Sequence, residues 1–238
     1  MRYLDLADAL RARIAGREFG AGGALPSEGE LGRNYGTSRV TVRRALDLLR
    51  QEGLVVSRRG AGWFVALDPV RQPLGRITTV EGAVEAAGAI AGRRILSFGY
   101  ASPPARVSDV LGSPADVLRI ERVNLADGQP FAYVTVWVRG DLGAELSRAD
   151  VERAPLYDVL PLRGVELTSV HQTITAEIAD DRVAALLEVD VHSPLLLACR
   201  VTRDSSGSTV MYSEHRSPAA RTQFEIEFSL SPGALQHV

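Results

Sequence analysis

The chain has 238 residues, of which 45% are hydrophobic, 27 are basic and 29 are acidic, and every basic residue is Arg. This composition is typical of a folded chain of one large or two small domains, and no run approaches ~18 consecutive apolar residues, so we expect neither disorder nor a membrane span. The single Cys199, four scattered His and acidic residues near the N-terminus argue against disulfides, metal, cofactors and a secretory signal, and favour a cytoplasmic protein.

Charge is unevenly distributed along the chain. Residues 1–65 carry 11 Arg and 7 acidic residues, whereas residues 66–238 carry 16 Arg and 22 acidic residues. A basic N-terminal quarter favours a polyanion-binding module joined to a second domain, although so modest an excess also arises by chance. An aperiodic segment with two prolines follows and predicts an extended linker. We therefore predict domains at 1–66 and 76–238 with a linker at 67–75.

Three helices are predicted in the N-terminal domain. The first covers residues 3–17, where apolar side chains recur at helical spacing. The second begins after Ser27, an N-cap candidate whose capping box is completed by Glu30. The third begins after Ser38 and ends at Gly53. Its apolar stripe is formed by Val42, Ala45, Leu46 and Leu49.

A tight turn at Gly36 between the second and third helices gives a helix-turn-helix pattern. In such a unit the later helix enters the major groove of DNA and its first residues reach the base edges. Arg can bond guanine bidentately, and hydroxyls suit phosphates. The alternative is an ordinary amphipathic helix with a solvated Arg face. The residues concerned are Ser38, Arg39, Val40, Thr41 and Arg43.

A basic β-hairpin is predicted directly after the third helix. Residues 54–57 and 63–65 are rich in β-formers and flank a turn that contains Arg58, Arg59 and Gly60. A hairpin in this position is a wing whose tip can lie along the minor groove, where the negative potential favours Arg. The alternative of a solvated hairpin tip is less consistent with a preceding helix-turn-helix.

From Leu25 to Val65 the sequence resembles the GntR family of bacterial transcription regulators almost without gaps. The stretches that carry the resemblance are Leu25-Pro26-Ser27-Glu28, Tyr35-Gly36, Ser38-Arg39, Thr41-Val42-Arg43, Glu52-Gly53-Leu54 and Arg59-Gly60. The resemblance implies base contacts from Arg39 and Arg43. It implies phosphate contacts from Ser27, Ser38 and Thr41, and a minor-groove position for Gly60. The same predicted DNA-binding set includes Glu28, Arg58 and Arg59. Where the family often has Arg in the second helix, this chain has Gly29, so operator preference or affinity is expected to differ.

The C-terminal domain is predicted to be an antiparallel sheet with helices to one side, which is an α+β fold. The expected strands are 94–100, 117–125, 131–138, 167–176, 195–202, 210–217 and 224–230. The expected helices are 79–92, a short one from 103, a turn at 156–160, and 179–187. A polar turn is expected at 204–208. The whole chain is therefore predicted as a winged helix-turn-helix domain joined to an α+β sensing domain.

No catalytic constellation is evident in this domain. His171, His192 and His215 lack a neighbouring nucleophile motif, and the run Ser213-Glu214-His215 lies on a predicted strand, where neighbouring side chains point to opposite faces. We therefore predict that the protein is not an enzyme. An enzyme with an appended DNA-binding head remains the alternative. A nucleoid protein is disfavoured by the acidic large domain.

The order of these elements resembles the UTRA ligand-sensing domain of the HutC subgroup. The matching features are Leu111, Ile120-Glu121-Arg122, Asp127-Gly128-Gln129-Pro130, Leu156-Tyr157, the 195–200 strand and Tyr212-Ser213-Glu214. This resemblance implies a small-metabolite effector bound between the sheet and its covering loops. It also implies a ligand contact from Arg122, whereas Asn124, Val134, Ala220 and Thr222 replace the family's Arg, Glu, Asp and Tyr. We therefore expect a less highly charged effector than a phosphosugar.

The predicted effector-binding residues are Arg122, Asn124, Thr135, Trp137, Tyr212 and Glu214. Ser97, Thr135, Trp137 and Tyr212 would supply hydroxyl and aromatic walls if they face inward, which strand parity alone does not settle. The alternative for Arg122 and Glu214 is a structural ion pair across the sheet. The function predicted from both resemblances is a bacterial repressor that binds an inverted-repeat DNA operator as a homodimer and responds to the effector.

Overall fold

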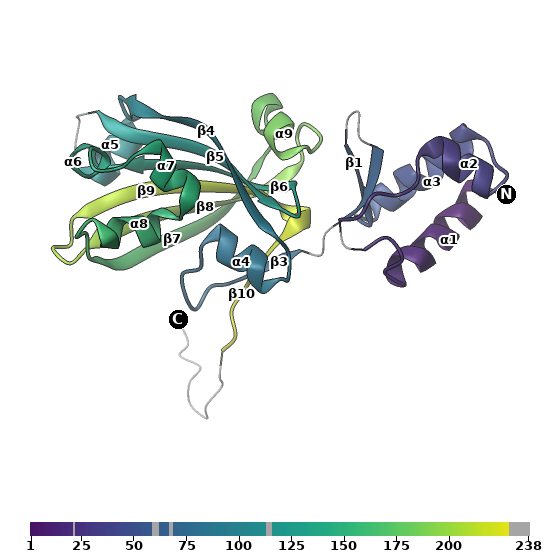
Figure 1. Ribbon diagram of the computed structural model, residues 1–238, viewed down its shortest axis with the longest axis horizontal. Helices are drawn as coiled ribbons and strands as arrows, with labels where there is room; N and C mark the ends of the chain where they lie inside the picture. The colour runs from purple at the N-terminus through teal and green to yellow at the C-terminus, as the bar shows by residue number, and fades with distance from the viewer. Residues whose placement is uncertain (21, 59–61, 67–68, 113–115, 229–238) are drawn as a thin grey trace, which may run out of the picture. The chain divides into compact units, whose positions relative to one another are not determined.

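The structure is a computed structural model, and it describes residues 1–20, 22–58, 62–66, 69–112 and 116–228. The chain divides into two compact units, Met1–Pro69 and Val70–Val238, and each is described by itself (Figure 1). Within the described residues, every helix is too short or too polar to cross a membrane.

The N-terminal unit contains three helices and a two-stranded antiparallel hairpin. The elements are α1 (Tyr3–Ala15), α2 (Glu28–Asn34), α3 (Arg39–Gln51), β1 (Val55–Arg58) and β2 (Gly62–Val65). Both predicted N-caps are confirmed: the Ser27 side chain accepts from the Glu30 N–H within a full capping box, and the Ser38 side chain accepts from the Thr41 N–H. The chain turns after α3 at Gly53, whose φ of 75° suits glycine.

One hydrophobic core holds this unit together. All four residues of the predicted α3 stripe are buried, and they pack with side chains from α1, α2 and the hairpin. The fully buried members include Leu6, Leu10, Leu31, Leu46 and Leu49. Because the core uses one side of α3, the other side of this helix is left to solvent.

The C-terminal unit is built on a six-stranded antiparallel sheet with the strand order β4-β5-β6-β9-β8-β7 (Figure 1). The strands are β4 (Ala91–Ala101), β5 (Val117–Ala126), β6 (Gln129–Val138), β7 (Leu167–Ile178), β8 (Pro194–Asp204) and β9 (Thr209–Pro218). The sheet confirms six of the predicted strands. The predicted helix over 79–92 is shorter than expected, because Gly88 takes a φ of 79° after α4 (Val80–Ala86) and β4 follows at once.

Helices cover both faces of this sheet, so the prediction of helices on one side is wrong. The side contacted by α4, α7 (Arg148–Arg153) and α8 (Leu156–Leu162) is named the α4 face. The opposite side, contacted by α5 (Ala105–Leu111) and α9 (Asp181–Leu187), is named the α9 face. Both faces of the central strands are apolar enough to require cover: every residue of β6 is buried.

A second, small sheet joins two segments that are far apart in the sequence. β3 (Val70–Pro73) pairs in parallel with β10 (Thr222–Glu225), and the Leu74 N–H donates to the Glu225 carbonyl at 2.7 Å. The sequence predicted an extended linker at 67–75, of which residues 67–68 lie outside the described residues. Residues 70–73 are instead a strand of the C-terminal unit, because a partner strand satisfies their backbone groups.

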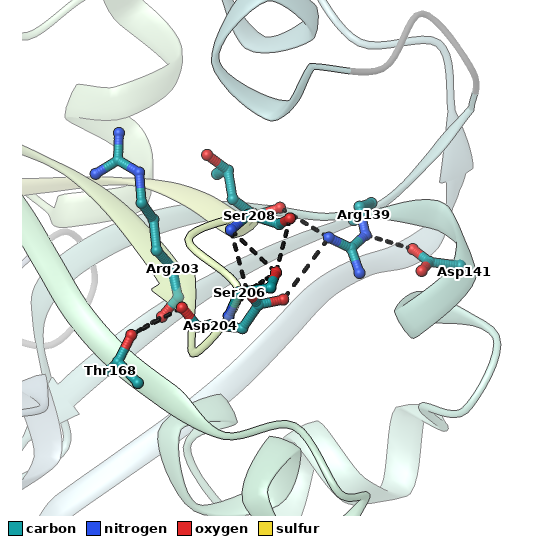
Figure 2. Close-up of polar contacts among 8 residues, drawn as sticks. Arg139, Asp141, Thr168, Arg203, Asp204, Ser206 and Ser208 are labelled. Atoms are coloured by element: carbon teal, nitrogen blue, oxygen red, sulfur yellow. Dashed lines mark hydrogen bonds and ion pairs between the residues drawn. The ribbon is translucent and has the colours of Figure 1, made fainter.

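The turn between β8 and β9 is closed by one carboxylate, as Figure 2 shows. Asp204 accepts from the backbone N–H groups of Ser206 and Ser208, both at 3.0 Å, and Thr168 of β7 donates to the Asp204 carbonyl at 2.8 Å. Arg139 at the end of β6 lies 4.0 Å from the Asp204 carboxylate and 2.8 Å from that of Asp141. These bonds confirm the polar turn predicted at 204–208 and fix the register of the hairpin.

Candidate functional site

The N-terminal half of α3 presents a positively charged surface. Arg39, Val40, Arg43 and Arg44 are exposed, and the buried stripe on the opposite side holds the helix against the core. The first turn of α3 contains no acidic residue, and within the described part of the chain no carboxylate forms an ion pair with these three arginines. Their guanidinium groups are therefore free to meet an external anion. Sequence reasoning named Arg39 and Arg43 but missed Arg44, although the Arg43-Arg44 pair was legible in the sequence.

The hydroxyl groups predicted to contact phosphate already have intramolecular partners. Ser27 Oγ donates to Glu30 Oε2 at 2.7 Å, and Ser38 Oγ lies 2.9 Å from Thr41 Oγ1. Each serine therefore begins a helix and fixes its direction. Ser27 and Ser38 are nevertheless exposed, so an external oxygen can still reach them.

Glu28 ties α2 to the hairpin. Its carboxylate accepts from the indole N–H of Trp63 at 3.2 Å, and Trp63 is buried in the core of the unit. The sequence placed Glu28 in the DNA-binding set, and the structure gives it a contact that positions β2. The wing itself is only partly described: Arg58 ends β1, whereas Arg59 and Gly60 lie outside the described residues.

Gly29 lies next to the first residue of the exposed helix. A Cβ built on Gly29 would lie 3.5 Å from Nη2 of Arg39 and 3.8 Å from Nη1 of Arg33. A Cβ at this position would therefore be in ordinary van der Waals contact with the Arg39 guanidinium. A long basic side chain at this position would meet Arg39 directly, which gives the departure at Gly29 a physical consequence for the same surface.

The predicted effector-binding residues divide between the two faces of the sheet. Arg122 pairs across the strands with Val134 and His215, whereas Thr135 pairs with Glu121 and Glu214 in the neighbouring row. Cross-strand partners share a face and successive residues alternate. The α4 face therefore carries Arg122 and Asn124. The α9 face carries Thr135, Trp137, Tyr212 and Glu214, and Ser97 lies with them. These residues do not line one pocket.

On the α4 face, Arg122 belongs to a buried polar cluster with Glu81 of α4. Its Nε donates to Asn124 Oδ1 at 3.1 Å, and its Nη2 lies 3.9 Å from Glu81 Oε1. Arg93 donates to the same Glu81 oxygen through Nε at 2.9 Å. Burial lowers the pKa of Arg122 to about 10, although the Glu81 charge opposes this shift. The alternative of a structural ion pair between Arg122 and Glu214 is wrong, because the two side chains lie on opposite faces.

Two further residues of the α4 face were missed by sequence reasoning. Arg200 of β8 is 3% exposed and donates to Gln172 Oε1 at 2.6 Å and to the Thr78 carbonyl at 3.2 Å. His215 shares a 2.9 Å contact with Ser213 through Nε2, and its Nδ1 has no partner among the described residues. Burial, with the charges of Arg200 and Arg122, holds the pKa of His215 well below its usual range. The sequence offered one signal for Arg200, which is its position directly after the apolar run 195–199 of the same strand.

On the α9 face, two buried carboxylates are each held by arginines. Glu214 pairs with Arg106 of α5 and, at 3.0 Å, with Arg216. Glu121 pairs with Arg119 and Arg182, both at 2.9 Å. Trp137 and Tyr212 stack beside them with ring centroids 5.6 Å apart. Each carboxylate thus has two guanidinium partners, whereas the buried indole N–H of Trp137 has no hydrogen-bond partner among the described residues.

The chemistry that the described residues support is the binding of anions. Among these residues, no group of three or more His, Cys, Asp or Glu side chains is arranged to hold a metal ion. The α3 surface offers cations to a polyanion, and the α4 face offers buried guanidinium groups within a sheet.

Comparison with known proteins supports both parts of this description. Residues 2–65 match the model for bacterial regulatory proteins of the gntR family, and residues 86–223 match the UTRA domain. The HTH-type transcriptional regulator Rv0792c of Mycobacterium tuberculosis is 35% identical over 231 residues, which cover 93% of this chain and 84% of that protein. The transcriptional repressor PhnF of Mycolicibacterium smegmatis is 34% identical over 77% of this chain and 75% of its own.

Solved structures show the same architecture. The crystal structure of PhnF from Mycobacterium smegmatis aligns with a TM-score of 0.62 and 28% identity over 95% of this chain and all of that one. Among the sequence relatives, the transcriptional repressor NagR of Bacillus subtilis is 26% identical over 87% of this chain and 86% of its own. These relatives are named as transcription regulators, which confirms the predicted class over the alternative of an enzyme with an appended DNA-binding head.

Proposed function

This chain belongs to the GntR family of bacterial regulatory proteins and carries a UTRA domain, and from this premise we propose that it is a cytoplasmic repressor. In this proposal, residues 1–66 bind an inverted-repeat operator, residues 76–238 form a homodimer and bind a small effector, and effector binding releases the DNA. The regulator binds DNA through its helix-turn-helix, as its family does.

The observation that carries the DNA-binding half is the free charge on α3. Arg39, Arg43 and Arg44 are exposed on a helix whose other side is fully buried, and described carboxylates leave them unpaired. A helix fixed in this way can enter the major groove, where an Arg fork bonds guanine O6 and N7. The predicted phosphate contacts of Ser27, Ser38 and Thr41 lie at the starts of α2 and α3, which is consistent with this orientation.

A dimer follows from the size of the DNA-binding unit. One winged unit offers a single recognition helix, and a two-fold pair of such helices reads two half-sites about one helical turn apart. The symmetry of the protein would then be mirrored in the operator. Two of the relatives are named as repressors, which favours repression over activation for this chain as well.

The effector half of the proposal places the ligand on the α4 face. Arg122 and Asn124 lie there, beneath α4, whereas the carboxylates of the α9 face are already paired. An effector that prefers one arrangement of the C-terminal units would shift the population of operator-competent dimers. In this proposal the ligand contacts only residues of the α4 face. The residues of the α9 face support the sheet from its other side and do not touch the ligand; they are Thr135, Trp137, Tyr212 and Glu214.

Selection of operator sequences tests the DNA-binding half. Full-length protein should enrich an inverted repeat from random duplexes, and binding should weaken steeply with salt, because each neutralised phosphate releases counterions. Arg43→Ala should weaken binding to the selected operator by about 1–3 kcal/mol, roughly tenfold to a hundredfold. The matched control is Arg94→Ala, an exposed Arg of β4 in the other unit. Equal affinity of Arg43→Ala and the parent protein would refute the groove assignment.

A further inference from the structure

A cavity of about 530 Å³ opens on the C-terminal unit, beside the cluster that surrounds Arg122. One wall is the segment 72–78, which leads from β3 into α4, and the other is formed by β7 and β8. Phe224 of β10 closes one end. The volume falls within the range of small-molecule sites. None of the residues predicted from the sequence to bind an effector lines it.

The lining combines two guanidinium groups with an apolar wall. Arg200 lies at the buried end and Arg76 is exposed at the mouth. The other polar groups of the wall are two amides and one hydroxyl, and none of the described lining residues is acidic. The apolar side is formed by Leu74, Ile77, Val170, Ile174 and Phe224. Leu74 and Ile77 are 39% and 42% exposed, so a ligand with an apolar body would cover surface that water now contacts.

The partners of Arg200 leave its charge uncompensated. Its Nε and Nη1 donate to the neutral oxygens of Gln172 and Thr78, and the structure gives it no ion pair among the described residues. Tyr157 is a further hydrogen-bond partner of Arg200, and it is uncharged as a phenol. The carboxylate that acts on Arg200 is Glu81, which already accepts from Arg93 and Asn124 and faces Arg122. Three buried guanidinium groups thus share one carboxylate. Burial lowers the pKa of Arg200, which reflects the free energy cost of holding this cation without a counter-charge.

We propose that this cavity is the effector site and that it binds a small organic carboxylate with an apolar body. That the ligand controls operator binding rests on the proposed function, whereas binding of the ligand to the cavity does not. The carboxylate would meet Arg200 at the buried end, because charge-assisted bonds to guanidinium are the strongest that the lining offers, and the charge of Arg76 at the mouth would add to the attraction of an anion. The apolar body would lie against Ile174 and Phe224.

The position of the cavity explains how such a ligand would act on DNA binding. The wall formed by residues 72–78 begins three residues after Pro69, where the N-terminal unit ends. A ligand that bridges Arg76 to Arg200 restrains this segment against β8. Restraint of the first segment of the C-terminal unit limits the positions open to the DNA-binding unit, and the coupling needs no contact between the ligand and DNA.

Calorimetric titration of the full-length protein tests the ligand class. The probes are benzoate, phenylacetate and octanoate, their uncharged amides, and phenyl phosphate. We expect at least one carboxylate to bind with a Kd below about 1 mM, and its uncharged amide to bind about tenfold more weakly or not at all. Failure of all three carboxylates, or equal binding of acid and amide, would overturn the proposal. Preferred binding of phenyl phosphate would overturn the carboxylate assignment.

Variants then locate the site. Arg76→Gln removes the exposed cation, Arg200→Gln the buried one, and Ile174→Trp fills the cavity without changing charge. Each should weaken binding of the carboxylate about tenfold or more, while Arg94→Gln, an exposed Arg outside the lining, should not. Circular dichroism identifies any misfolded variant, and Arg76→Gln keeps the test valid if Arg200→Gln does not fold. Unchanged binding by both Arg76→Gln and Ile174→Trp would place the ligand elsewhere.

Operator titration separates this inference from the proposed function. Ligand binding with no effect on operator affinity would support the cavity and contradict effector-controlled release. Lack of any operator binding by the ligand-free protein would contradict the proposed function and leave the calorimetric result standing.

Discussion

The two units of this protein display their functional residues by different rules. In α3, a period of 3.6 residues gathers Val42, Leu46 and Leu49 on the buried side and leaves Arg43 and Arg44 outside that stripe, so local sequence alone separates core from surface. In the six-stranded sheet, both faces are covered and every residue of β6 is buried. Sidedness there depends on cross-strand register, which no single strand encodes. A site on an amphipathic helix can therefore be predicted from the sequence, whereas a site on a sheet that is covered on both faces cannot.

The largest expected effect tests whether the two units are independent. Leu46 is fully buried in the core of the N-terminal unit, so Leu46→Ala should destabilise that unit by about 2–5 kcal/mol. Operator binding should be lost, while carboxylate binding by the C-terminal unit should persist. Scanning calorimetry of the full chain should show one transition moved to lower temperature and the other unchanged.

The matched control for this prediction is Leu4→Ala. Leu4 lies on α1 and is 44% exposed, so the substitution should change stability by less than about 0.5 kcal/mol. A shift of both transitions in Leu46→Ala would mean that the two units unfold as one, and the division at Pro69 would then have no thermodynamic meaning.

The parts of the structure that sequence predicted are those decided within a few residues. The capping box of Ser27 and Glu30, the turn at Gly53 and the polar turn closed by Asp204 all depend on neighbours in the chain. Residues 70–73 were misassigned to a linker because their strand partner, residues 222–225, lies at the other end of the chain. Proline at both sides of this segment gave a local signal that long-range pairing overrode.

The same reasoning explains why the candidate effector site was only partly predicted. Arg122 and Glu214 were both predicted to bind the effector from neighbouring strands, but their faces depend on the register of β5, β6 and β9. Glu81 and Arg200, which complete the environment of Arg122, come from α4 and β8. No motif links these positions in sequence. Only the packing of α4 over the sheet brings them together.

Acidification should lower the free energy of unfolding of the C-terminal unit, because this unit buries His215. Because the pKa of His215 is lowered in the folded protein, the unfolded chain takes up a proton near pH 6.5 that the folded chain refuses. The stability contributed by neutral His215 is therefore complete above that pH and is lost as pH falls, by at most ~1.4 kcal/mol per pH unit. Urea denaturation at pH 7, 6 and 5 measures this slope.

A variant and a matched control identify the group responsible. His215→Gln should flatten the dependence between pH 7 and 5, whereas His171→Gln, on the exposed edge strand β7, should leave it unchanged. The lowered pKa of Glu81 acts mainly at the acidic end of this window and below it, and the comparison of the two variants separates its contribution from that of His215. An unchanged slope in His215→Gln would show that this histidine takes up a proton in the folded state.

Replacement of Arg122 should have a smaller effect on stability and a clear effect on regulation. Burial disfavours its charge, and Glu81 keeps Arg93 as a partner when Arg122 is removed. Arg122→Met should therefore leave the free energy of unfolding unchanged or raise it by about 1 kcal/mol. Operator binding should stay intact, and effector release should weaken, because removal of Arg122 leaves the charge of Glu81 to act on Arg200 of the cavity. A loss of about 3 kcal/mol or more would mean that Arg122 is a needed structural partner of Glu81.

The smallest expected effect separates capping from DNA contact at Ser27. Ser27 and Ser147 begin α2 and α7 with the same capping box, in which a side chain at the third helical position returns to the serine backbone. Ser27→Ala and Ser147→Ala should each cost about 1 kcal/mol in their own unit, because both lose one bond to a helical N–H. If the Ser27 hydroxyl also contacts phosphate, Ser27→Ala should in addition weaken operator binding severalfold, and Ser147→Ala should not. Chemical denaturation and operator titration of both variants measure the two effects. Equal operator affinities would reduce Ser27 to a helix cap and leave the α3 arginines as the main determinants of binding.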